Sequence, residues 1–411
     1  MATIAVLGAL EAHGPQHQFL ADCIRQKGHR AIFVDVGFCG IPQLAPHISR
    51  ESVAGLTDLD WKIFRKDLQS ARKMMLNAAP KKLRQLCDQK KIQGAICLGF
   101  GSAETTGSAA LEMLPFGFPK VLLLPHPPSA FRSEPPPLDD TLRFPCALKL
   151  EKLNRLSRPI LARAAGTICG MVESTVPQAQ EDSPLIFASV FGNTATGVHL
   201  ASKLLEQKGY HVLQFHATGT GGRRMESLIH LDVAAGVLDY TLKEWADEVV
   251  GGVLSAGPTR LEAAAQRGTP TVVVPGCLDI VNFYGQETVP ERFAGRRFHR
   301  HSPKATLLRT SPEESTSIGR RVAQKLNQST GPLTLLLPLR GVSSIGAPGF
   351  AFHDPKADAA LFQSLRSNLR KNIPVLEIDA TVSDPIFARA AAEALLVNIA
   401  KKRTKPTAET H

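Results

Sequence analysis

The sequence predicts two α/β domains with mostly parallel sheets, and three observations lead to this fold class. One pattern occurs twice, about 180 residues apart, at 3–37 and 185–219: an apolar run ending in Gly, a helical stretch ending in Lys-Gly, and a second apolar run. Apolar runs then alternate with single helical stretches through the second half of the chain. A chain of 411 residues is also too long for one ordinary core. We therefore expect two Rossmann-like domains that bind ligands where their strands end, with a cleft between the two rims.

The first domain is assigned to residues 1–178. Short apolar runs bounded by Gly or Pro predict buried parallel strands at 3–8, 31–37, 94–101 and 119–127. Helices are expected between the first two strands, at 61–91 and at 149–172. The Pro-rich segment 125–137 excludes a regular helix or a central strand and predicts a surface excursion.

The second domain is assigned to residues 184–403, because segment 174–184 has the composition of a linker. Its strands are expected at 185–191, 211–216, 235–239, 270–275, 332–337 and 374–379. Its helices are expected at 198–208, 222–231, 241–250, 258–267, 312–328, 356–370 and 384–400. Single helices between strands imply right-handed crossovers and a mostly parallel sheet.

Composition and charge disfavour several classes of protein. Hydrophobic residues at 43% and charged residues at 21% are ordinary for a soluble globular chain. The net charge is +11, but Lys and Arg are scattered, so solvated basic faces or a small anionic ligand explain it better than nucleic acid. Seven widely spaced Cys without a CxxC pair disfavour zinc and a disulfide framework, and no metal ligand set is assigned. No apolar run approaches the roughly 20 residues of a membrane span, so we expect no membrane association and a cytoplasmic location.

The stretch HATGTGGRRME contains the sharpest local motif. A strand ends at His216, a Gly-rich loop follows, and a helix begins at once, which exposes backbone amides that attract phosphate or carboxylate. The predicted anion-binding residues are Thr218, Gly219, Thr220, Gly221 and Gly222, with Arg340 after a later strand as a carboxylate clamp. The glycine spacing does not match the dinucleotide fingerprint, so NAD is not implied. The alternative is a tight strand–helix turn that needs glycine for close packing.

Two loops of the first domain form a second candidate site. GALEAHG places Glu11 and His13 at the end of the first strand, where they could hold a ribose, a metal-bound water or a proton in transit. GFGSAETTGS adds hydroxyl groups at the same rim. The alternative is that Glu11 and His13 are solvated turn residues.

Acidic and amide groups at neighbouring strand ends suggest catalysis in the second domain. Asp239 ends one strand, and Asp279 and Asn282 follow the next, where α/β enzymes place a general base or metal ligands. Buried capping residues are the alternative. His299 and His301 alone are a weak metal signal. The absence of GxSxG, a Walker lysine loop and HExxH disfavours serine hydrolases, P-loop NTPases and zincins.

Long stretches of the chain resemble the Tm-one-like ATP-binding family, an uncharacterised family whose plant members include the tomato mosaic virus resistance protein. The resemblance is strongest in FHATGTGGRRMESLI, GVLDYTLKEWADEVVGGVLSAGPTRLEAA, VVVPGCLDIVNF, VPERFAGRRFHRHSP and LLRTSPEE. It implies two Rossmann-like domains, ATP binding at the N-terminal one, and a homodimer. Proposed interface features are the excursion at 125–137, with Phe131, and the helix at 149–172.

The first-domain loops depart from the family pattern. Members usually read Gly-Thr-x-Asp-Thr-Lys-Gly after the first strand, whereas this chain has Ala9, Ala12 and His13 in place of the two Thr and the Lys. The lost groups are a phosphate counter-charge and two donors. The nucleotide-binding residues that the resemblance implies are Gly8, Glu11, His13, Gly14, Gly99, Gly101, Ser102 and Thr105.

Three functions are consistent with these observations. The first is nucleotide binding in the first domain, with ATP and magnesium as candidate ligands. The second is an enzyme acting on a small anionic metabolite at the second rim, with His216 as acid or base and with Asp239 and Asp279 completing the site. The third is a protein-binding scaffold, because the plant relatives engage a viral protein.

Overall fold

The computed structural model describes residues 1–55, 67–100, 103–125, 140–146, 152–175 and 182–404. The chain divides into two compact units, Met1–Gln178 and Ala179–His411, each with its own hydrophobic cores. Both units are built on all-parallel sheets, which confirms the predicted fold class. The cleft expected between the two rims stays a prediction.

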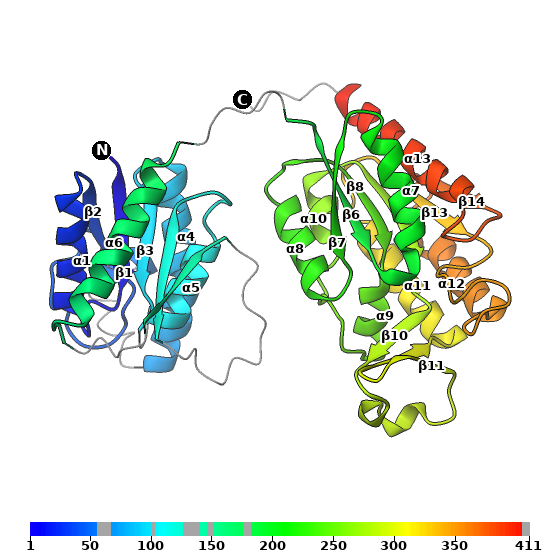
Figure 1. Cartoon of the computed structure of the whole chain (residues 1–411), viewed down its shortest axis with the longest axis horizontal. Helices are drawn as coiled ribbons and strands as arrows, with labels where there is room; N and C mark the ends of the chain where they lie inside the picture. Colours follow the sequence, from blue (N-terminus) through cyan, green and yellow to red (C-terminus); the bar gives the residue numbers. More distant parts are fainter. Residues whose placement is uncertain (56–66, 101–102, 126–139, 147–151, 176–181, 405–411) are drawn as a thin grey trace. The chain divides into compact units, whose positions relative to one another are not determined.

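The N-terminal unit has three layers around a sheet of order β2-β1-β3-β4-β5 (Figure 1). Its elements are β1 (Thr3–Gly8), α1 (Gly14–Gln26), β2 (Arg30–Asp35), α2 (Arg50–Ala54), α4 (Leu68–Asp88), β3 (Gly94–Leu98), α5 (Ala103–Glu112), β4 (Lys120–Pro125), β5 (Leu142–Cys146) and α6 (Ser157–Glu173). α1 and α6 cover one face of the sheet, and α2, α4 and α5 cover the other. Successive β1 residues alternate between the two cores, because neighbouring side chains of a strand point to opposite faces.

The C-terminal unit has a sheet of order β14-β13-β9-β8-β6-β7. Its strands are β6 (Leu185–Val190), β7 (His211–His216), β8 (Ala234–Thr241), β9 (Thr271–Gly276), β13 (Leu333–Pro338) and β14 (Val375–Ile378). Its helices are α7 (Ala195–Glu206), α8 (Thr220–Ile229), α9 (Lys243–Val250), α10 (Glu262–Arg267), α11 (Pro312–Leu326), α12 (Pro355–Asn368) and α13 (Pro385–Thr404). α7 and α13 cover one face of the sheet, and α8 to α12 cover the other.

The sequence repeat corresponds to a repeat of topology. In both units the first strand lies beside the second on one side and the third on the other. In each unit a glycine with left-handed backbone lies shortly after the helix between the first two strands, Gly28 with φ 83° and Gly209 with φ 84°. Glycine adopts this conformation without a steric penalty, which explains the Lys-Gly pair in each copy.

Four strands were not predicted. β5 carries Arg143 and Pro145 and lies half-exposed at the sheet edge, so it lacks the apolar run of a buried strand. β10 (Ile280–Phe283), β11 (Phe298–Ser302) and β12 (Ala305–Arg309) form an antiparallel sheet of order β10-β12-β11 beyond the end of β9. β11 consists of FHRHS, which has no apolar alternation, and its pairing with β12 decides its structure.

The predicted helix at 149–172 is shorter than expected. α6 begins at Ser157, and its apolar residues Leu161, Ala164 and Ile168 are buried in the N-terminal core with α1. The apolar side proposed for a dimer interface is therefore used within the unit. Phe131 lies outside the described residues, and the homodimer stays a prediction. No helix in the described part of the chain is long and apolar enough to span a membrane.

Candidate functional site

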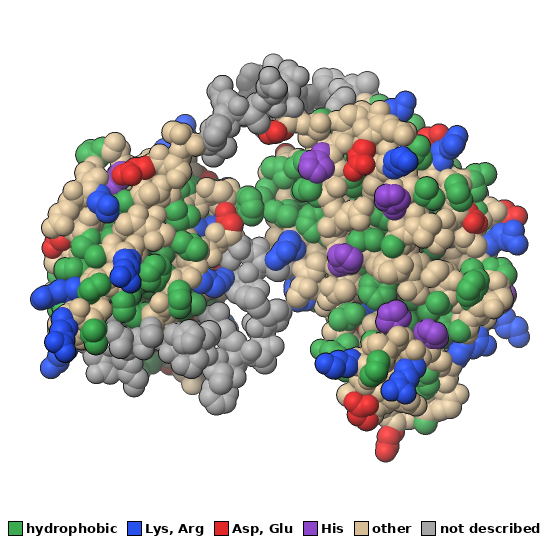
Figure 2. Space-filling view, viewed as in Figure 1, with side chains coloured by type: hydrophobic (Ala, Val, Ile, Leu, Met, Phe, Trp, Pro, Cys, Tyr) green, Lys and Arg blue, Asp and Glu red, His purple; other side chains and the backbone are tan. Residues whose placement is uncertain are grey.

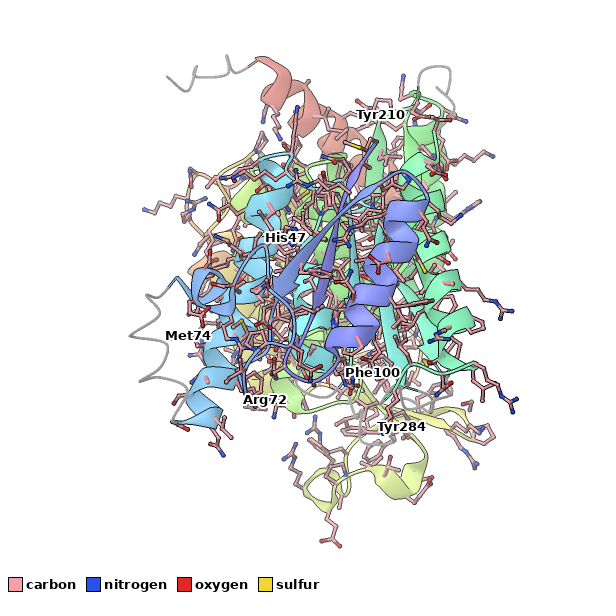
Figure 3. All side chains as sticks on the ribbon, turned by 90° about the vertical axis from the view of Figure 1, so that its left-hand side faces the viewer. His47, Arg72, Met74, Phe100, Tyr210 and Tyr284 are labelled. Atoms are coloured by element: carbon pink, nitrogen blue, oxygen red, sulfur yellow. The ribbon has the colours of Figure 1, made fainter. Side chains whose placement is uncertain are left out.

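The candidate nucleotide site lies at the topological switch point of the N-terminal sheet. β1 leads to β2 on one side, and β3 lies on the other, so the loops that follow β1 and β3 are neighbours at the carboxyl end of the sheet. The ring of His13 meets Phe100 edge to face, with 5.9 Å between centroids. Phe100 is labelled in Figure 3. The structure therefore brings two predicted loops together. Gly101 and Ser102 lie outside the described residues.

Close packing accounts for the glycines of these loops. A Cβ on Gly8 would lie 1.8 Å from His17 Nε2, and one on Gly14 would lie 2.6 Å from the Cβ of Gln43. A Cβ on Gly99 would lie 2.7 Å from the Leu123 carbonyl oxygen. Each distance is far below van der Waals contact, so these positions require glycine whether or not a ligand binds.

Glu11 points into the unit rather than toward solvent. Its Oε1 accepts the Cys39 amide at 3.2 Å, and its Oε2 lies 3.6 Å from Nη2 of Arg50. Arg50 donates from Nε to Asp35 at 2.8 Å, and Asp35 also accepts the Leu10 and Gly37 amides. Burial raises the pKa of Asp35 to about 6, against the opposing effect of the Arg50 charge. The alternative of a solvated turn residue is therefore wrong for Glu11, which helps to hold the loop after β1 in place.

His17 and Arg50 were not predicted as parts of this region. The His17 ring is fully buried below Gly8, and its Nδ1 lies 2.6 Å from the His13 carbonyl oxygen. Burial lowers the pKa of His17 to about 4, so the ring is neutral at pH 7. Thr105, by contrast, is exposed in the first turn of α5.

The Gly-rich loop of the C-terminal unit binds a carboxylate from its own chain. Oε1 of Glu244 accepts the Gly219 amide at 2.7 Å and the Gly222 amide at 3.1 Å. A Cβ on Gly222 would lie 2.1 Å from Glu244 Oε2, and one on Gly221 would lie 1.8 Å from the His216 carbonyl oxygen. The predicted turn that needs glycine for close packing is thus present. The amides of Thr220 and Gly221 donate to no residue among those the structure describes.

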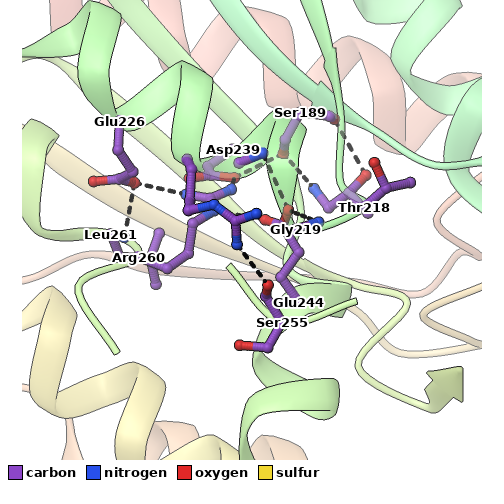
Figure 4. Close-up of polar contacts among 12 residues, drawn as sticks. Ser189, Thr218, Gly219, Glu226, Asp239, Glu244, Ser255, Arg260 and Leu261 are labelled. Atoms are coloured by element: carbon purple, nitrogen blue, oxygen red, sulfur yellow. Dashed lines mark hydrogen bonds and ion pairs between the residues drawn. The ribbon is translucent and has the colours of Figure 1, made fainter. Parts of the chain in front are cut away.

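Below this loop, Arg260 joins three carboxylates (Figure 4). It donates to Asp239 from Nη1 at 2.6 Å and from Nη2 at 2.5 Å, to Glu244 from Nε at 2.9 Å and to Glu226 from Nη1 at 3.0 Å. Ser189 Oγ also donates to Asp239, at 2.7 Å. Burial raises the pKa of Glu244, while the Arg260 charge opposes the shift. Asp239 therefore occupies a buried ion-pair position, and its catalytic role stays a prediction.

Asp279 is buried at the end of another loop. Its Oδ2 accepts Ser343 Oγ at 2.6 Å, whereas Oδ1 has no hydrogen-bond partner in the described part of the chain. Burial raises the pKa of Asp279, and the charge of Arg309 opposes this shift. The loops after β6, β9 and β13 are tied together above the sheet, by the Cys277 amide to Val342 and the Ser344 amide to Asn193. The C-terminal loops close over Asp279 instead of leaving it open.

The sheet order separates the residues predicted for catalysis. His216 is exposed at the end of edge strand β7, and two strands lie between β7 and β9, a separation of about 14 Å at typical strand spacing. Arg340 follows β13 and is exposed, about 19 Å from β7 by the same spacing. By sheet order, His216 and the Gly-rich loop are therefore one location, Asp279 is a second, and Arg340 follows a strand apart from both. The role of Arg340 in anion binding stays a prediction.

Family models match both units: the "Uncharacterised protein family (UPF0261) N-terminal domain" matches residues 2–177, and its C-terminal domain matches residues 183–399. The chain belongs to the UPF0261 family. A UPF0261 protein of Clostridium tetani is 39% identical over 396 residues, which cover 96% of this chain and 98% of that protein. The UPF0261 protein RA0729 of Rhizobium meliloti is 38% identical, with coverage of 96% and 98%.

A plant protein shares part of its length with this UPF0261 member. The "ToMV resistance protein Tm-1(GCR237)" of Solanum lycopersicum is 33% identical over 323 residues, or 77% of this chain and 43% of the plant protein. Among solved structures, UDP-N-acetylglucosamine 2-epimerase from Rickettsia bellii covers 98% of this chain and 99% of its own, at 10% identity and a TM-score of 0.23. That score carries no argument about function.

Proposed function

We propose that the N-terminal unit binds a nucleotide, with ATP as the first candidate, between the loops that follow β1 and β3. The observation that carries the proposal is the strand order β2-β1-β3-β4-β5, which makes these loops neighbours at the switch point where doubly wound sheets bind ligands. The resemblance of the chain to the Tm-one-like ATP-binding family also supports nucleotide binding by the N-terminal unit.

The charges near this site favour a phosphate group at the loop after β1, where α1 begins. α1 begins at Gly14 with no side-chain cap and no acidic residue in its first turn. The positive end of the helix dipole therefore lies at the loop after β1. Glu11 and Asp35 face Arg50 inside the unit, so their charges are partly compensated before a ligand arrives. Magnesium would supply the counter-charge that the missing family lysine does not.

Isothermal titration of the whole chain with ATP and ADP, with and without magnesium, tests the proposal. We expect saturable heat with ATP and a weaker affinity after His13→Ala. Absence of both heat and a thermal shift at millimolar nucleotide would exclude ATP binding by this protein.

A second candidate function is favoured by the amides of Thr220 and Gly221. Both lie at the start of α8, beside exposed His216, and both lack an acceptor in the described structure. An enzyme acting on a small anionic metabolite would bind its carboxylate there and use His216 as acid or base. Crystals soaked with hydroxy and keto acids test this, and density for an acid only in the N-terminal unit would exclude it.

A further inference from the structure

A groove of about 750 Å³ lies between α2 and α4 of the N-terminal unit. Its size is in the range of pockets that hold small organic ligands. Its lining includes Ser52 of α2 and Lys73, Met74, Asn77, Lys81 and Lys82 of α4. None of these residues belongs to the loops after β1 and β3, so the groove is separate from the proposed nucleotide site. Met74 is labelled on α4 in Figure 3.

A second groove of about 680 Å³ continues the first along edge strand β2. The two share Ser52, Lys82 and Gln85 as lining residues. The second groove also includes Arg30 and Lys91 as cations, and His47, labelled beside β2 in Figure 3. The combined surface runs from α2 to the beginning of β1.

The charged side chains among the described residues that line the two grooves are all positive. The cationic lining residues are Arg30, Lys73, Lys81, Lys82 and Lys91, and no Asp or Glu is among the described residues that line either groove. None of the five is paired with a carboxylate in the part of the chain that the structure describes. Burial lowers the pKa of His47, and the charges of Arg25 and Arg30 lower it further. Unpaired like charges along a concave surface attract anions.

The groove floor is apolar between these cations. Val53 and Ala54 of α2 and Met74 and Ala78 of α4 line the first groove, and Ile32, Ile48 and Leu86 line the second. Val53, Ile32 and Leu86 are buried, and the others are partly exposed, so an inorganic ion would leave apolar surface of the groove in water. A ligand with both an acidic head and an apolar body would use the whole lining.

We propose that this basic groove binds a small organic anion that carries an apolar body and a carboxylate, sulfonate or phosphate head. The proposal concerns a different surface from the switch point and does not depend on nucleotide binding. On the face in Figure 2, Lys and Arg are scattered among other side chains.

The test uses 8-anilinonaphthalene-1-sulfonate, an apolar anion, in isothermal titrations with the full chain. We expect one site on the folded protein and about a tenfold loss of affinity in the triple variant Lys73→Gln, Lys81→Gln, Lys82→Gln. The matched control is Lys27→Gln, Arg72→Gln, Lys90→Gln, which removes the same charge from exposed residues that line neither groove, and should stay within about twofold of wild type.

The outcomes separate this proposal from its alternatives. Equal losses in the two triple variants would show that net charge alone attracts the probe and would overturn the proposal. A change from dimer to monomer in the groove variant, measured by light scattering, would show that a second copy covers the groove and would also overturn it. Asn77→Trp, which fills the groove without changing its charge, should also weaken binding of the probe. ATP titrations of the groove variant should match wild type, because the switch point lies elsewhere.

Discussion

The Gly219 amide donates to Oε1 of Glu244 at 2.7 Å, so a loop with the composition of an anion site already holds an anion from its own chain. Glu244 is buried on α9 and also accepts from Arg260, which ties the loop to the middle of the sheet. Buried carboxylates need such partners, because an unpaired charge in the interior is costly. The loop is therefore shaped by the packing of its own unit, and its amides at Thr220 and Gly221 have no acceptor among the residues that the structure describes.

Replacing Glu244 should destabilise the C-terminal unit. Glu244→Ala leaves Arg260 and the amides of Gly219 and Gly222 without their acceptor, which we expect to lower the free energy of unfolding by about 3–5 kcal/mol. Urea unfolding followed by circular dichroism measures the change. The control is Glu206→Ala, at an exposed position on α7, which should change stability by less than about 0.5 kcal/mol. Equal effects of the two variants would argue against a structural role for Glu244.

Two glycine substitutions within helices should act in opposite directions. Gly222→Ala places a methyl group 2.1 Å from Oε2 of Glu244 and should lower stability by about 1–3 kcal/mol. Gly170→Ala in α6 meets no atom within 4 Å and should raise stability by roughly 0.5–1 kcal/mol, because alanine favours the helix. Thermal unfolding of both variants provides the comparison. If Gly222→Ala leaves stability unchanged, the loop moves away from Glu244 without cost and the predicted clash is absent.

Stability should depend on the titration of His17. Burial lowers its pKa from 6.5 to about 4, so between these values the unfolded chain binds more protons than the folded one. The free energy of unfolding therefore rises with pH across this window, and about 3 kcal/mol present above pH 6.5 is lost as pH falls to 4. His17→Gln should flatten the dependence measured by urea unfolding from pH 4 to 7. The control is His216→Gln, at an exposed histidine. If His17→Gln leaves the pH dependence of the free energy of unfolding unchanged, His17 is not the group that titrates in this window.

Position 13 should control nucleotide affinity. The family pattern implied by the resemblance has Lys where this chain has His13, and a lysine there would add a full positive charge beside the proposed phosphate position. We expect His13→Lys to tighten ATP binding by about tenfold, and His13→Ala to weaken it, in titrations at low ionic strength. The difference should shrink in high salt. If His13→Lys and wild type bind ATP equally, the phosphates do not lie beside the loop after β1.

The sequence alone determined the fold class, the two repeated units and the positions of most buried strands. Continuous apolar runs, such as those of β1 and β6, predict buried strands directly, because a strand covered on both faces carries mostly apolar side chains along its length. The glycines of both loops were also identified, since close approach and left-handed backbone restrict those positions to glycine. The strands β5 and β11 lacked such runs, and only their pairing revealed them.

Only the tertiary structure decided which polar residues meet. Glu11 and Arg50 lie 39 positions apart, and Asp239 and Arg260 lie 21 apart, yet each pair is buried as partners. Sequence spacing gives no sign of such pairs, because the sheet order sets which strand ends are neighbours. The same order separates His216 from Asp279, two residues that resemble a catalytic pair in the sequence. Buried charge pairs join residues that are distant in the sequence, so they depend on how the strands assemble into the sheet. Hydrophobic patterns lie within short segments, so the sequence alone reveals them.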